Sequence, residues 1–542
     1  MANARVTAPL ELVPLGGVGE FGKNVLWLRS GDSSILVDAG VSFPDESLPG
    51  IDRIAPDLSA LRAERIDGVF LTHGHEDHVG ALSFLRELCD APVYGFPFTL
   101  ALARRRLEEA QSPLDRLVEA RGREPVRAGA FTVTFFRVSH SVPDSAALLI
   151  EAGGRRLVHS GDFKLDDDPP DGEKTDRDGI AAAIGEGVDL ALVDSTNAER
   201  PGRSQSERVA GEGLRAAFGQ APGRIVLTTF SSHVARVAQA SEAALAMGRR
   251  VAILGRSMRA VAEIAERFGR LRLPAGSRPA AADLRDIAPG RLLCLTSGSQ
   301  GEPFSALHRL ALGEHADLEL EEGDLVLISA RTIPGHERSV NRMSDHLVRR
   351  GARVVRESEP PIHVSGHAHS GEIAEWLRLV RPGAVMPVHG DRRMLAAAAE
   401  VAASAGVAPG RIHLLDNGDR LILTPGGERV DSGAAPAGSV FLDARSEAVD
   451  PAIVRERRHL AEEGVVVILV RGDAVEVVSR GVVANAEALA GEVSRATRAV
   501  LARATGDELR DPEWLKAEIA VAVKRACRRA LGLRPVVVPV LR

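Results

Sequence analysis

The stretch Val69-Phe70-Leu71-Thr72-His73-Gly74-His75-Glu76-Asp77-His78-Val79-Gly80 decides how the rest of the chain is interpreted. Its first three residues predict the end of a buried strand, because a continuous apolar run with β-branched and aromatic side chains suits a strand covered on both faces. Imidazole and carboxylate groups directly beyond such a strand suit zinc or a similar divalent ion. His73 and His75 can point to one ion, while Asp77 and His78, at the start of a helix, can point to a second. The alternative is a polar loop that contains its histidines by chance.

Composition limits the class of protein. A chain of 542 residues is too long for one hydrophobic core, so two or three domains are expected. Hydrophobic residues at 44% and charged residues at 26% are typical of a soluble globular protein. The three cysteines, Cys89, Cys294 and Cys527, are too few and too far apart to predict a disulfide framework or a thiolate zinc site. The formal net charge of -6 does not by itself indicate a nucleic-acid binder, although it says nothing of a local cleft.

Location is predicted from what the sequence lacks. Residues 1–9 contain no apolar signal core, and no segment approaches the roughly 18 uninterrupted apolar residues that a spanning helix needs. We therefore expect a cytoplasmic protein with no membrane partner.

Residues 11–40 alternate apolar strands with glycine turns, which predicts an antiparallel sheet at the start of a layered α/β domain. Asp38 ends the last of these strands. A buried carboxylate needs partners, so we expect Asp38 to hydrogen-bond the loop from His73 to His78 and fix it. The alternative is an aspartate that only caps its own turn.

Further strands end at residues of the same kind. His140 follows the apolar run 133–138, Asp162 follows the run that begins at Leu157, and His389 follows Met386-Pro387-Val388. The series His-x-His-x-Asp-His, then His140, then Asp162 resembles the ligand series of the metallo-β-lactamase superfamily. That resemblance implies a four-layered αββα sandwich with metals at the edge of its two sheets. The final histidine is delayed to His389 by a long insertion.

The insertion, residues 207–360, has an α/β rhythm of its own. Strands are predicted at 224–230, 250–254, 292–295 and 324–329, with helices at 232–247 and 258–268, which indicates a parallel, doubly wound module. The first strand ends at Ser231, Ser232 and His233, where small hydroxyl groups usually line the ligand crevice of an open sheet. Serines at such places can also be simple helix caps.

Five further motifs lie within and after the insertion: Gly255-Arg256-Ser257-Met258, Gly298-Ser299-Gln300-Gly301-Glu302-Pro303, Ile333-Pro334-Gly335-His336-Glu337, Ser365-Gly366-His367-Ala368-His369 and Pro387-Val388-His389-Gly390. Their order narrows the resemblance to the β-CASP group and, within it, to the ribonuclease J family. His336 departs from the family, which more often has Asn. His159, beside Asp162, is an extra imidazole that we do not count as a ligand.

The resemblance and the composition together divide the chain. Residues 1–206 and 361–430 are expected to form a metallo-β-lactamase domain, 207–360 the β-CASP domain, 431–450 a linker rich in Gly, Ala and Pro, and 451–542 a small C-terminal α/β domain. In that last domain a hairpin around Arg471-Gly472-Asp473, helices at 485–504 and 512–531 and a strand at 536–541 are predicted. The resemblance assigns it to assembly as a homodimer or homotetramer. Its basic residues Lys524, Arg525, Arg528, Arg529 and Arg534 could instead touch RNA, although a basic helix face is most often merely solvated.

The resemblance also implies the chemistry. One ion takes His73, His75 and His140, the other takes Asp77, His78 and His389, and Asp162 bridges them. Zinc is expected, with Mn²⁺ or Mg²⁺ as alternatives. Two such ions about 4 Å apart can hold a shared water as hydroxide near neutral pH, and that hydroxide attacks a phosphodiester. Asp194 is expected to hydrogen-bond His367 and keep it protonated for the leaving oxygen, and which of the two is donor stays open.

The resemblance implies that the substrate is single-stranded RNA, cut from a 5′-monophosphate end in the 5′-to-3′ direction and also internally, in RNA maturation and decay. The 5′ phosphate is expected to lie among Ser231, Ser232, His233, His363, Val364, Ser365, Gly366 and His367. Other RNA-degradation proteins are expected as partners. Two alternatives stay open: a small-molecule metallohydrolase, which would have no use for so long an insertion, and a non-catalytic RNA-binding or scaffold subunit, which would not need every ligand position filled.

Overall fold

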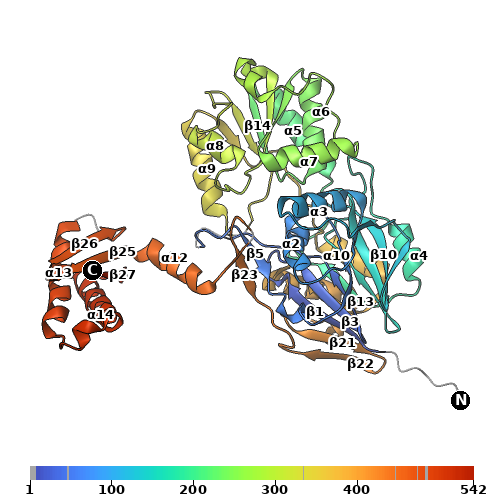
Figure 1. The fold of residues 1–542 in the computed structure, drawn as a ribbon. Coiled ribbons are helices and arrows are strands. Elements are labelled where there is room, and N and C mark those ends of the chain that lie inside the picture. Colours follow the sequence, from blue (N-terminus) through green and yellow to red (C-terminus); the bar gives the residue numbers. More distant parts are fainter. Residues whose placement is uncertain (1–7, 45–47, 334, 446, 473, 483–485) are drawn as a thin grey trace. The chain divides into compact units, whose positions relative to one another are not determined.

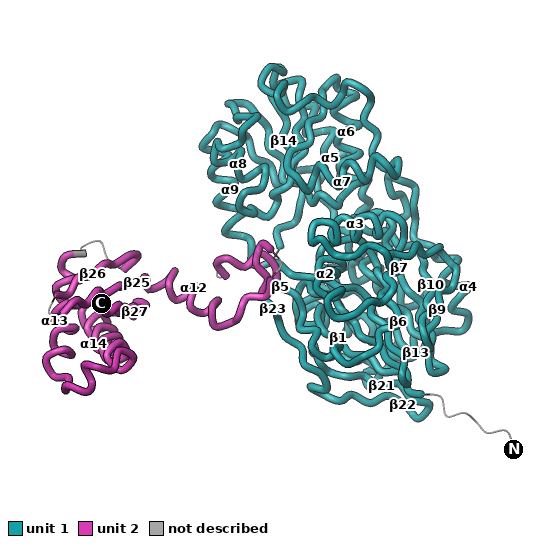
Figure 2. Tube along the Cα trace, viewed as in Figure 1, with its two compact units in different colours: residues 1–43, 54–440 teal, residues 44–53, 441–542 magenta. Residues whose placement is uncertain are grey.

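The computed structural model describes residues 8–44, 48–333, 335–445, 447–472, 474–482 and 486–542. It contains two units, residues 1–43 with 54–440, and residues 44–53 with 441–542 (Figure 2). All the residues expected at the metal site belong to the first unit. The N-terminal segment 1–7, Pro334 of the Ile-Pro-Gly-His-Glu motif and Asp473 of the expected hairpin turn lie outside the described residues.

Two sheets form the centre of the first unit (Figure 1). The first has the strand order β22-β21-β1-β3-β4-β6-β7-β8, and the second has the order β19-β13-β12-β11-β10-β9. The bounds of the first sheet are β1 (Leu10–Gly16), β3 (Val25–Ser30), β4 (Ser33–Val37), β6 (Ile66–Phe70), β7 (Val93–Gly95), β8 (Leu117–Glu119), β21 (Arg420–Thr424) and β22 (Gly427–Asp431). Those of the second are β9 (Pro125–Ala128), β10 (Phe131–Val138), β11 (Ser145–Ala152), β12 (Arg155–His159), β13 (Val188–Asp194) and β19 (Pro382–Val388).

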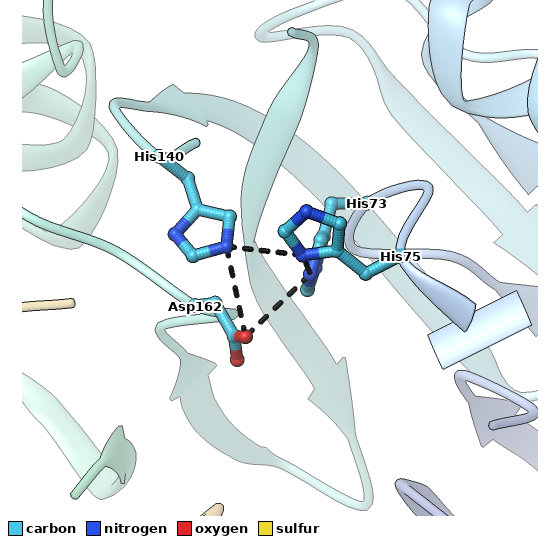
Figure 3. Close-up of side chains that lie close together, drawn as sticks. All are labelled: His73, His75, His140 and Asp162. Carbon is cyan, nitrogen blue, oxygen red and sulfur yellow. Dashed lines mark hydrogen bonds and ion pairs between the residues drawn. The ribbon is translucent and has the colours of Figure 1, made fainter. Parts of the chain in front are cut away.

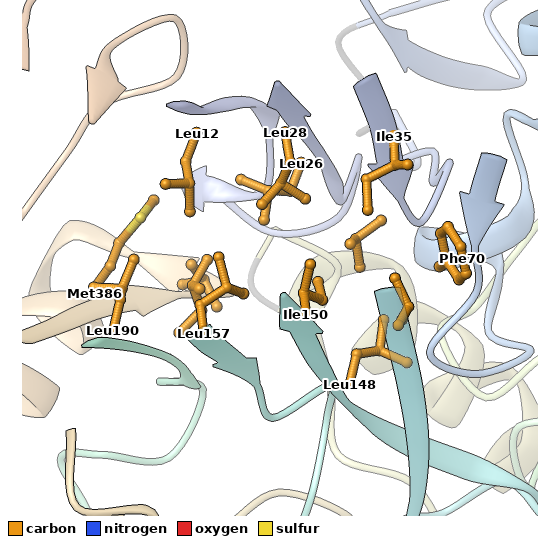
Figure 4. Close-up of a cluster of buried hydrophobic side chains, with 14 of the residues drawn as sticks. Leu12, Leu26, Leu28, Ile35, Phe70, Leu148, Ile150, Leu157, Leu190 and Met386 are labelled. Carbon is orange, nitrogen blue, oxygen red and sulfur yellow. The ribbon is translucent and has the colours of Figure 1, made fainter. Parts of the chain in front are cut away.

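The main hydrophobic core lies between these sheets. Leu12, Leu28 and Ile35 of the first sheet face Ile150 and Leu157 of the second, and each of them is completely buried. Figure 4 shows the two rows of apolar side chains pointing toward each other from opposite strands. Period-two alternation thus gives each strand one face toward this core and a second face toward an outer layer.

Helices cover the outer face of each sheet. The first sheet packs against α2 (Leu82–Arg86) and α3 (Pro97–Glu109), with Leu82 and Leu107 in the shared core. The second packs against α4 (Arg177–Ile184), α10 (Ser370–Val380) and α11 (Arg392–Ser404), with Trp376 fully buried. The order helix, sheet, sheet, helix confirms the predicted αββα sandwich.

The insertion is a separate parallel sheet with the order β15-β16-β14-β17-β18. Its strands are β14 (Ile225–Thr228), β15 (Arg250–Leu254), β16 (Leu292–Thr296), β17 (Leu325–Ile328) and β18 (Arg353–Val355). Its helices are α5 (Glu207–Gly219), α6 (Val234–Ala246), α7 (Arg256–Arg267), α8 (Ala306–Leu312) and α9 (Glu337–Arg349). Apolar clusters form on both faces of the sheet, one with α5 to α7 and the other with α8 and α9, so the predicted doubly wound module is confirmed.

The C-terminal part of the second unit is a small α/β fold. Strands β25 (Val465–Arg471) and β26 (Ala474–Arg480) pair antiparallel, β27 (Val536–Leu541) joins β25 in parallel, and α13 (Ala486–Arg503) and α14 (Pro512–Leu531) cover one face. The hairpin and closing strand follow the prediction. Within the described residues no helix combines the length and the apolar character needed to cross a bilayer.

Three local features differ from the sequence prediction. The helix expected to start at Asp77 and His78 is two short helices, α1 (Glu76–Val79) and α2, because the chain turns at Gly80 and Ala81. Residues 431–450, expected as a linker, include the short paired strands β23 (Ser439–Leu442) and β24 (Ala448–Val449). Helix α12 (Pro451–Glu463), capped by the Asp450 side chain, precedes β25 and was not predicted.

The segment that follows β4 fixes α1 by backbone hydrogen bonds. Ala39 N–H donates to the His78 carbonyl at 2.7 Å, and Val41 N–H donates to the Glu76 carbonyl at 3.1 Å. Between them, Gly40 approaches so closely that a Cβ placed there would lie 1.6 Å from the Asp77 carbonyl oxygen. Only glycine fits at this position.

Gly40→Ala is therefore expected to push α1 away and destabilise the protein by about 1–3 kcal/mol, the usual cost of overpacking. It should also lower the number of divalent ions retained after dialysis, because Asp77 and His78 move with α1. Thermal unfolding and metal content of the purified protein measure both effects. Gly219→Ala, where a Cβ meets nothing within 4 Å, is the control. Unchanged stability and metal content in Gly40→Ala would contradict the packing argument.

Candidate metal centre

Asp38 hydrogen-bonds residues of the loop that carries His73 to His78, as the sequence predicts. Its Oδ1 accepts from Thr72 N–H at 2.7 Å, and its Oδ2 accepts from Thr72 Oγ1 and lies 2.8 Å from His78 Nδ1. The carboxylate is only 2% exposed, and its backbone has a left-handed φ of 62°. A contact from one carboxylate oxygen to His78 Nδ1 leaves Nε2 as the nitrogen that faces the site.

The carboxylate of Asp162 lies at the centre of the cluster. Its Oδ2 is 3.5 Å from His73 Nε2, 3.4 Å from His78 Nε2 and 3.5 Å from His389 Nε2. His140 Nε2 is slightly farther, at 3.8 Å. One oxygen therefore faces imidazoles from both halves of the expected ligand set.

The first half comprises His73, His75, His140 and Asp162, shown in Figure 3. His75 Nδ1 lies 3.1 Å from His73 Nε2 and 3.3 Å from His140 Nε2. His140 Nδ1 is 2.8 Å from the Gly366 carbonyl oxygen, which can only accept. The Nδ1 of His140 is thus the protonated nitrogen, and Nε2 has a free lone pair toward the other donors.

The second half comprises Asp77, His78, Asp162 and His389. His389 Nε2 lies 3.2 Å from Asp77 Oδ2, while its Nδ1 is 2.6 Å from Thr196 Oγ1. His389 follows β19 with a left-handed φ of 57°. The insertion separates His389 from the other ligands in sequence, but β19 pairs in parallel with β13 and brings it back to the same sheet edge.

Asp194 and His367 lie beside this cluster. His367 Nδ1 is 2.8 Å from Asp194 Oδ2 and 4.0 Å from Asp162 Oδ2. Asp194 ends β13, is 1% exposed and lies 3.5 Å from His389 Nδ1 through its other oxygen. The predicted Asp194 to His367 contact is present, and Asp194 contacts a second imidazole that the sequence did not indicate.

The histidines of the site fall into two groups, one with lowered and one with raised pKa values. Burial lowers the pKa of His73 and of His140, and it lowers the pKa of His75 to about 4, so these rings are neutral, as metal ligands must be. Burial also opposes charge on His78, but the carboxylates of Asp162, Asp77 and Asp38 outweigh it and raise its pKa to about 10. The pKa of His389 is raised in the same way, against burial, by Asp162, Asp194 and Asp77.

The carboxylates show the reverse effect. Burial would raise the pKa of Asp162, yet the imidazoles of His389, His78 and His73 hold it well below its usual range. The side with Asp77, His78 and His389 thus attracts positive charge, and a divalent cation there would replace the protons on the two histidines.

These donors fit a pair of divalent ions. In each half, one nitrogen or oxygen from every residue lies within 4.8 Å of all the others, which is the spacing that ligands of a common ion need. The donors are imidazoles and carboxylates, the set that zinc and manganese accept. His159 is not among them, because its Nδ1 accepts from Gly161 N–H at 3.0 Å.

The residues expected to hold the 5′ phosphate are less uniform in their surroundings. Ser231 and Ser232 are half-buried, as are Ser365 and Gly366, whereas His233 and Val364 are buried. His363 Nδ1 accepts from the guanidinium of Arg236 at 2.6 Å. His233 Nε2 lies 3.4 Å from Glu207, and burial, followed by Arg236, lowers its pKa. Both histidines thus lie against one buried ion pair.

Sequence reasoning missed three polar residues at the centre. Asn24 Nδ2 lies 3.1 Å from His78 Nε2 and donates to the Asp77 carbonyl at 3.0 Å. Thr196 and Asn197 follow Asp194, and they contact His389 and Ser365 respectively. Thr196 and Asn197 could have been suspected from their place after a strand that ends in Asp194. Asn24 gives no such signal, since its partners lie more than fifty residues away.

Comparison with known protein families agrees with this architecture. The beta-lactamase superfamily domain matches residues 33–254, and the Ribonuclease J beta-CASP domain matches 222–347. A Zn-dependent metallo-hydrolase RNA specificity domain matches 359–412, and the Ribonuclease J C-terminal domain matches 452–542. Fold and donor set thus define a metal-dependent hydrolase of the metallo-β-lactamase superfamily with an inserted β-CASP domain.

Whole-chain relatives identify the family. Ribonuclease J of Mycobacterium tuberculosis (strain ATCC 25618 / H37Rv) is 42% identical over 80% of this chain and 78% of its own length. The Ribonuclease J proteins of Mycolicibacterium smegmatis and Thermus thermophilus are each 38% identical over 98% of this chain, and over 96% and 95% of their own lengths. The chain belongs to the ribonuclease J family, and it is a metal-dependent ribonuclease that binds RNA.

A solved structure shares the fold. A crystal structure of a protein of unknown function from Enterococcus faecalis V583 superimposes with a TM-score of 0.55. The superposition covers 77% of this chain and 100% of that one, at 18% identity. At that identity the likeness concerns the fold alone.

The ion pair beneath His233 and His363 provides a test of stability. Arg236 is completely buried and makes bonds to both carboxylate oxygens of Glu207, at 2.8 and 2.6 Å, and to the Val364 carbonyl at 3.2 Å. Against burial, Arg236 and then His233 hold the Glu207 pKa well below its usual range. Glu207 is the first residue of the insertion, and residues 363 and 364 lie just after the insertion ends. The Glu207–Arg236 ion pair therefore connects the two chain segments that link the domains.

Glu207→Gln is expected to lower the free energy of unfolding by about 3–5 kcal/mol, because it leaves a buried guanidinium without its counter-charge. Chemical denaturation measures this loss. The depressed Glu207 pKa means that the wild type has this stabilisation above the unfolded pKa of about 4.3 and loses it as the pH falls further, so the two proteins should converge in acid. Glu212→Gln, exposed on the same helix, is the control. Equal loss in both variants would contradict the assignment.

Proposed function

We propose that the centre holds two divalent ions, with Zn²⁺ as the first choice and Mn²⁺ or Mg²⁺ as alternatives. His73, His75 and His140 would hold one, Asp77, His78 and His389 the other, and Asp162 would bridge them. The observation behind this proposal is the single oxygen of Asp162, which lies within 3.8 Å of an imidazole nitrogen from each half. Bound ions would supply the Lewis acidity that activates water and stabilises negative charge on a phosphodiester.

Asp194 and His367 would together supply the proton that the leaving sugar oxygen needs. Asp194 contacts Nδ1 of His367, so Nε2 is the ring atom left for a leaving sugar oxygen. His367 is partly exposed, with 19% of its side chain accessible, while Asp194 is buried. A buried carboxylate that contacts Nδ1 of a partly exposed imidazole orients the ring, which suits a group that gives a proton to the leaving oxygen.

The proposed activity is 5′-to-3′ exonucleolytic hydrolysis of single-stranded RNA with a preference for 5′-monophosphate ends, together with internal cleavage, in RNA maturation and decay. The pocket for the 5′ phosphate would be formed by Ser231, Ser232 and His233 and by the loop from His363 to His367. Support comes from the position of that loop. His367 lies at the metal centre, and the His363 end lies against Arg236 of the insertion.

We further propose that the protein assembles as a homodimer or homotetramer through its C-terminal domain. On the face of the sheet opposite α13 and α14, Val467 lies beside Val478 on one side and Val538 on the other. Val478 is 37% exposed and Val538 is 41% exposed, an apolar row that a second copy would cover. Other RNA-degradation proteins are proposed as partners and the cytoplasm as the location.

Single substitutions distinguish the metal ligands from the residue that transfers the proton. His75→Ala and Asp162→Ala should each lose a metal and lower RNA cleavage by at least about 100-fold, because a ligand is removed. His367→Ala should keep both metals and lower kcat by about 100- to 10,000-fold, the usual contribution of a general acid. Metal analysis and single-turnover cleavage measure these outcomes, with His346→Ala on α9 as the control. If His75→Ala and Asp162→Ala cleave at the wild-type rate, the two-metal assignment is wrong; halved metal in His367→Ala would make His367 a ligand.

The type of cleavage is tested with end-labelled RNA that carries either a 5′ monophosphate or a 5′ triphosphate. The monophosphorylated RNA should be degraded at least about 10-fold faster, since the pocket accepts one phosphate, and the label should be released as a mononucleotide. Product sizing by gel electrophoresis distinguishes this from the discrete fragments of internal cleavage. Equal rates for the two RNAs would refute the monophosphate preference.

A further inference from the structure

Arg331 extends from the insertion to the domain that holds the metal centre. It lies just beyond β17, its side chain is exposed, and its NH1 donates to Asn197 Oδ1 at 2.7 Å. Asn197 is 2% exposed and lies three residues beyond Asp194. The guanidinium therefore ends beside the loop that follows β13.

Arg200 is anchored on the same asparagine. Its N–H donates to the Asn197 carbonyl at 2.9 Å, and its own carbonyl accepts from Ser370 N–H at 2.9 Å. Asn197 thus contacts the side chain of Arg331 from the insertion and the backbone of Arg200 in its own domain. Burial, and after it the charge of Arg200, lowers the pKa of Arg331, which places the two guanidinium groups within electrostatic range.

Within the described residues, neither of these two like charges has a directly bonded carboxylate partner. Across the described ranges, neither guanidinium makes a hydrogen bond or ion pair with an acidic side chain. Glu199 is electrostatically close to Arg331 but lies 3.7 Å from Arg393. Other arginines nearby are paired, Arg203 with Asp167 and Glu375, and Arg208 with Asp168. Exposed arginines held together in this way attract an anion.

The Gly-Ser-Gln-Gly-Glu-Pro motif positions Arg331. Gln300 Nε2 donates to the Arg331 carbonyl at 3.0 Å, and its Oε1 accepts from Ile333 N–H at 2.7 Å. Glu302 in turn accepts from Gln300 N–H at 2.9 Å. The backbone on both sides of Arg331 is fixed by one side chain, which gives this motif a role apart from the metal centre.

The same asparagine connects the arginines to the candidate acid. Asn197 Nδ2 donates to Ser365 Oγ at 2.8 Å and to the His367 carbonyl at 3.3 Å. The arginine pair therefore lies one hydrogen-bonded residue away from the loop that presents His367. A strand that reaches the metal centre past this loop would bring one of its phosphates to the pair.

We propose that Arg200 and Arg331 form a subsite for a backbone phosphodiester of the RNA strand, separate from the 5′-phosphate pocket and spanning the two domains. This inference rests on the RNA-cleaving function proposed above. Guanidinium groups suit a phosphodiester because they offer paired N–H donors in one plane, and because their charge does not depend on pH in the working range. Binding there would release counter-ions and contribute to the salt dependence of RNA affinity.

The test compares RNA cleavage by the wild-type holoenzyme with that of Arg200→Gln, Arg331→Gln and Arg331→Lys between 50 and 200 mM NaCl. Each Gln variant should raise KM for a single-stranded RNA by roughly 3- to 10-fold with kcat within about 2-fold, and should make the slope of log(kcat/KM) against log salt shallower by about 0.7. Arg331→Lys should keep the wild-type slope. Hydrolysis of bis(p-nitrophenyl) phosphate, which has no neighbouring phosphate, should be unchanged in all of them. Arg208→Gln, which removes an arginine already paired with Asp168, is the matched control.

The outcomes distinguish this inference from the proposed function. If both Gln variants cleave RNA with the wild-type salt slope, the subsite does not exist, although the enzyme remains a nuclease. If Arg331→Gln lowers kcat at an unchanged slope and Arg200→Gln has no effect, Arg331 only holds Asn197, and the inference is also overturned. An equal change in Arg208→Gln would show a general charge effect and refute it as well. A wild-type enzyme that does not cleave RNA would refute the proposed function instead.

Discussion

The structure depends on keeping one buried carboxylate, that of Asp162, ionised although it is almost inaccessible to solvent. Burial alone would raise its pKa, and the surrounding imidazoles reverse that effect. In turn, the carboxylates of Asp38, Asp77 and Asp194 sustain positive charge on His78 and His389. A buried charge of either sign is costly unless it is paired, so no member of this group is independent of the others. Divalent cations would also neutralise these buried carboxylates, and the histidines would then not need to be protonated.

The two central sheets explain why these groups meet. Each ligand lies either just beyond the end of a strand or in the short helix that comes directly after a strand. These strands end at one edge of the sandwich. Backbone contacts then fix the short connections, as when the residues after β4 bond to α1. The insertion leaves this arrangement after Asp194 and returns before His367, so it is attached beside the centre at two points. Its parallel sheet has its own hydrophobic cluster, and Phe98 and Leu102 of α3 join that cluster, so the insertion packs directly on an outer helix of the sandwich.

Much of this could be predicted from sequence, because the decisive residues lie at strand ends. The cluster at His73 to His78 follows an apolar run, and Asp162, Asp194 and His389 do the same, so period and position together indicate a shared edge. Contacts of residues that carry no local signal could not be predicted. Asn24 against His78 and Arg236 against His363 depend on tertiary packing and leave no local pattern. The break between α1 and α2 was missed because apolar residues continue at helical spacing beyond Gly80, and the strands within 431–450 were missed because glycine and proline there favoured a loop.

The pairing of β1 with β21 has a consequence for synthesis of the protein. Leu10 pairs with Leu423, which is synthesised about four hundred residues later. The edge of the first sheet therefore stays open through most of translation, exposing backbone donors and acceptors that can join other nascent chains. His389 also emerges late, so a growing chain has an incomplete ion site. The complete ligand set is therefore present only after β19 and the histidine that follows it have been synthesised.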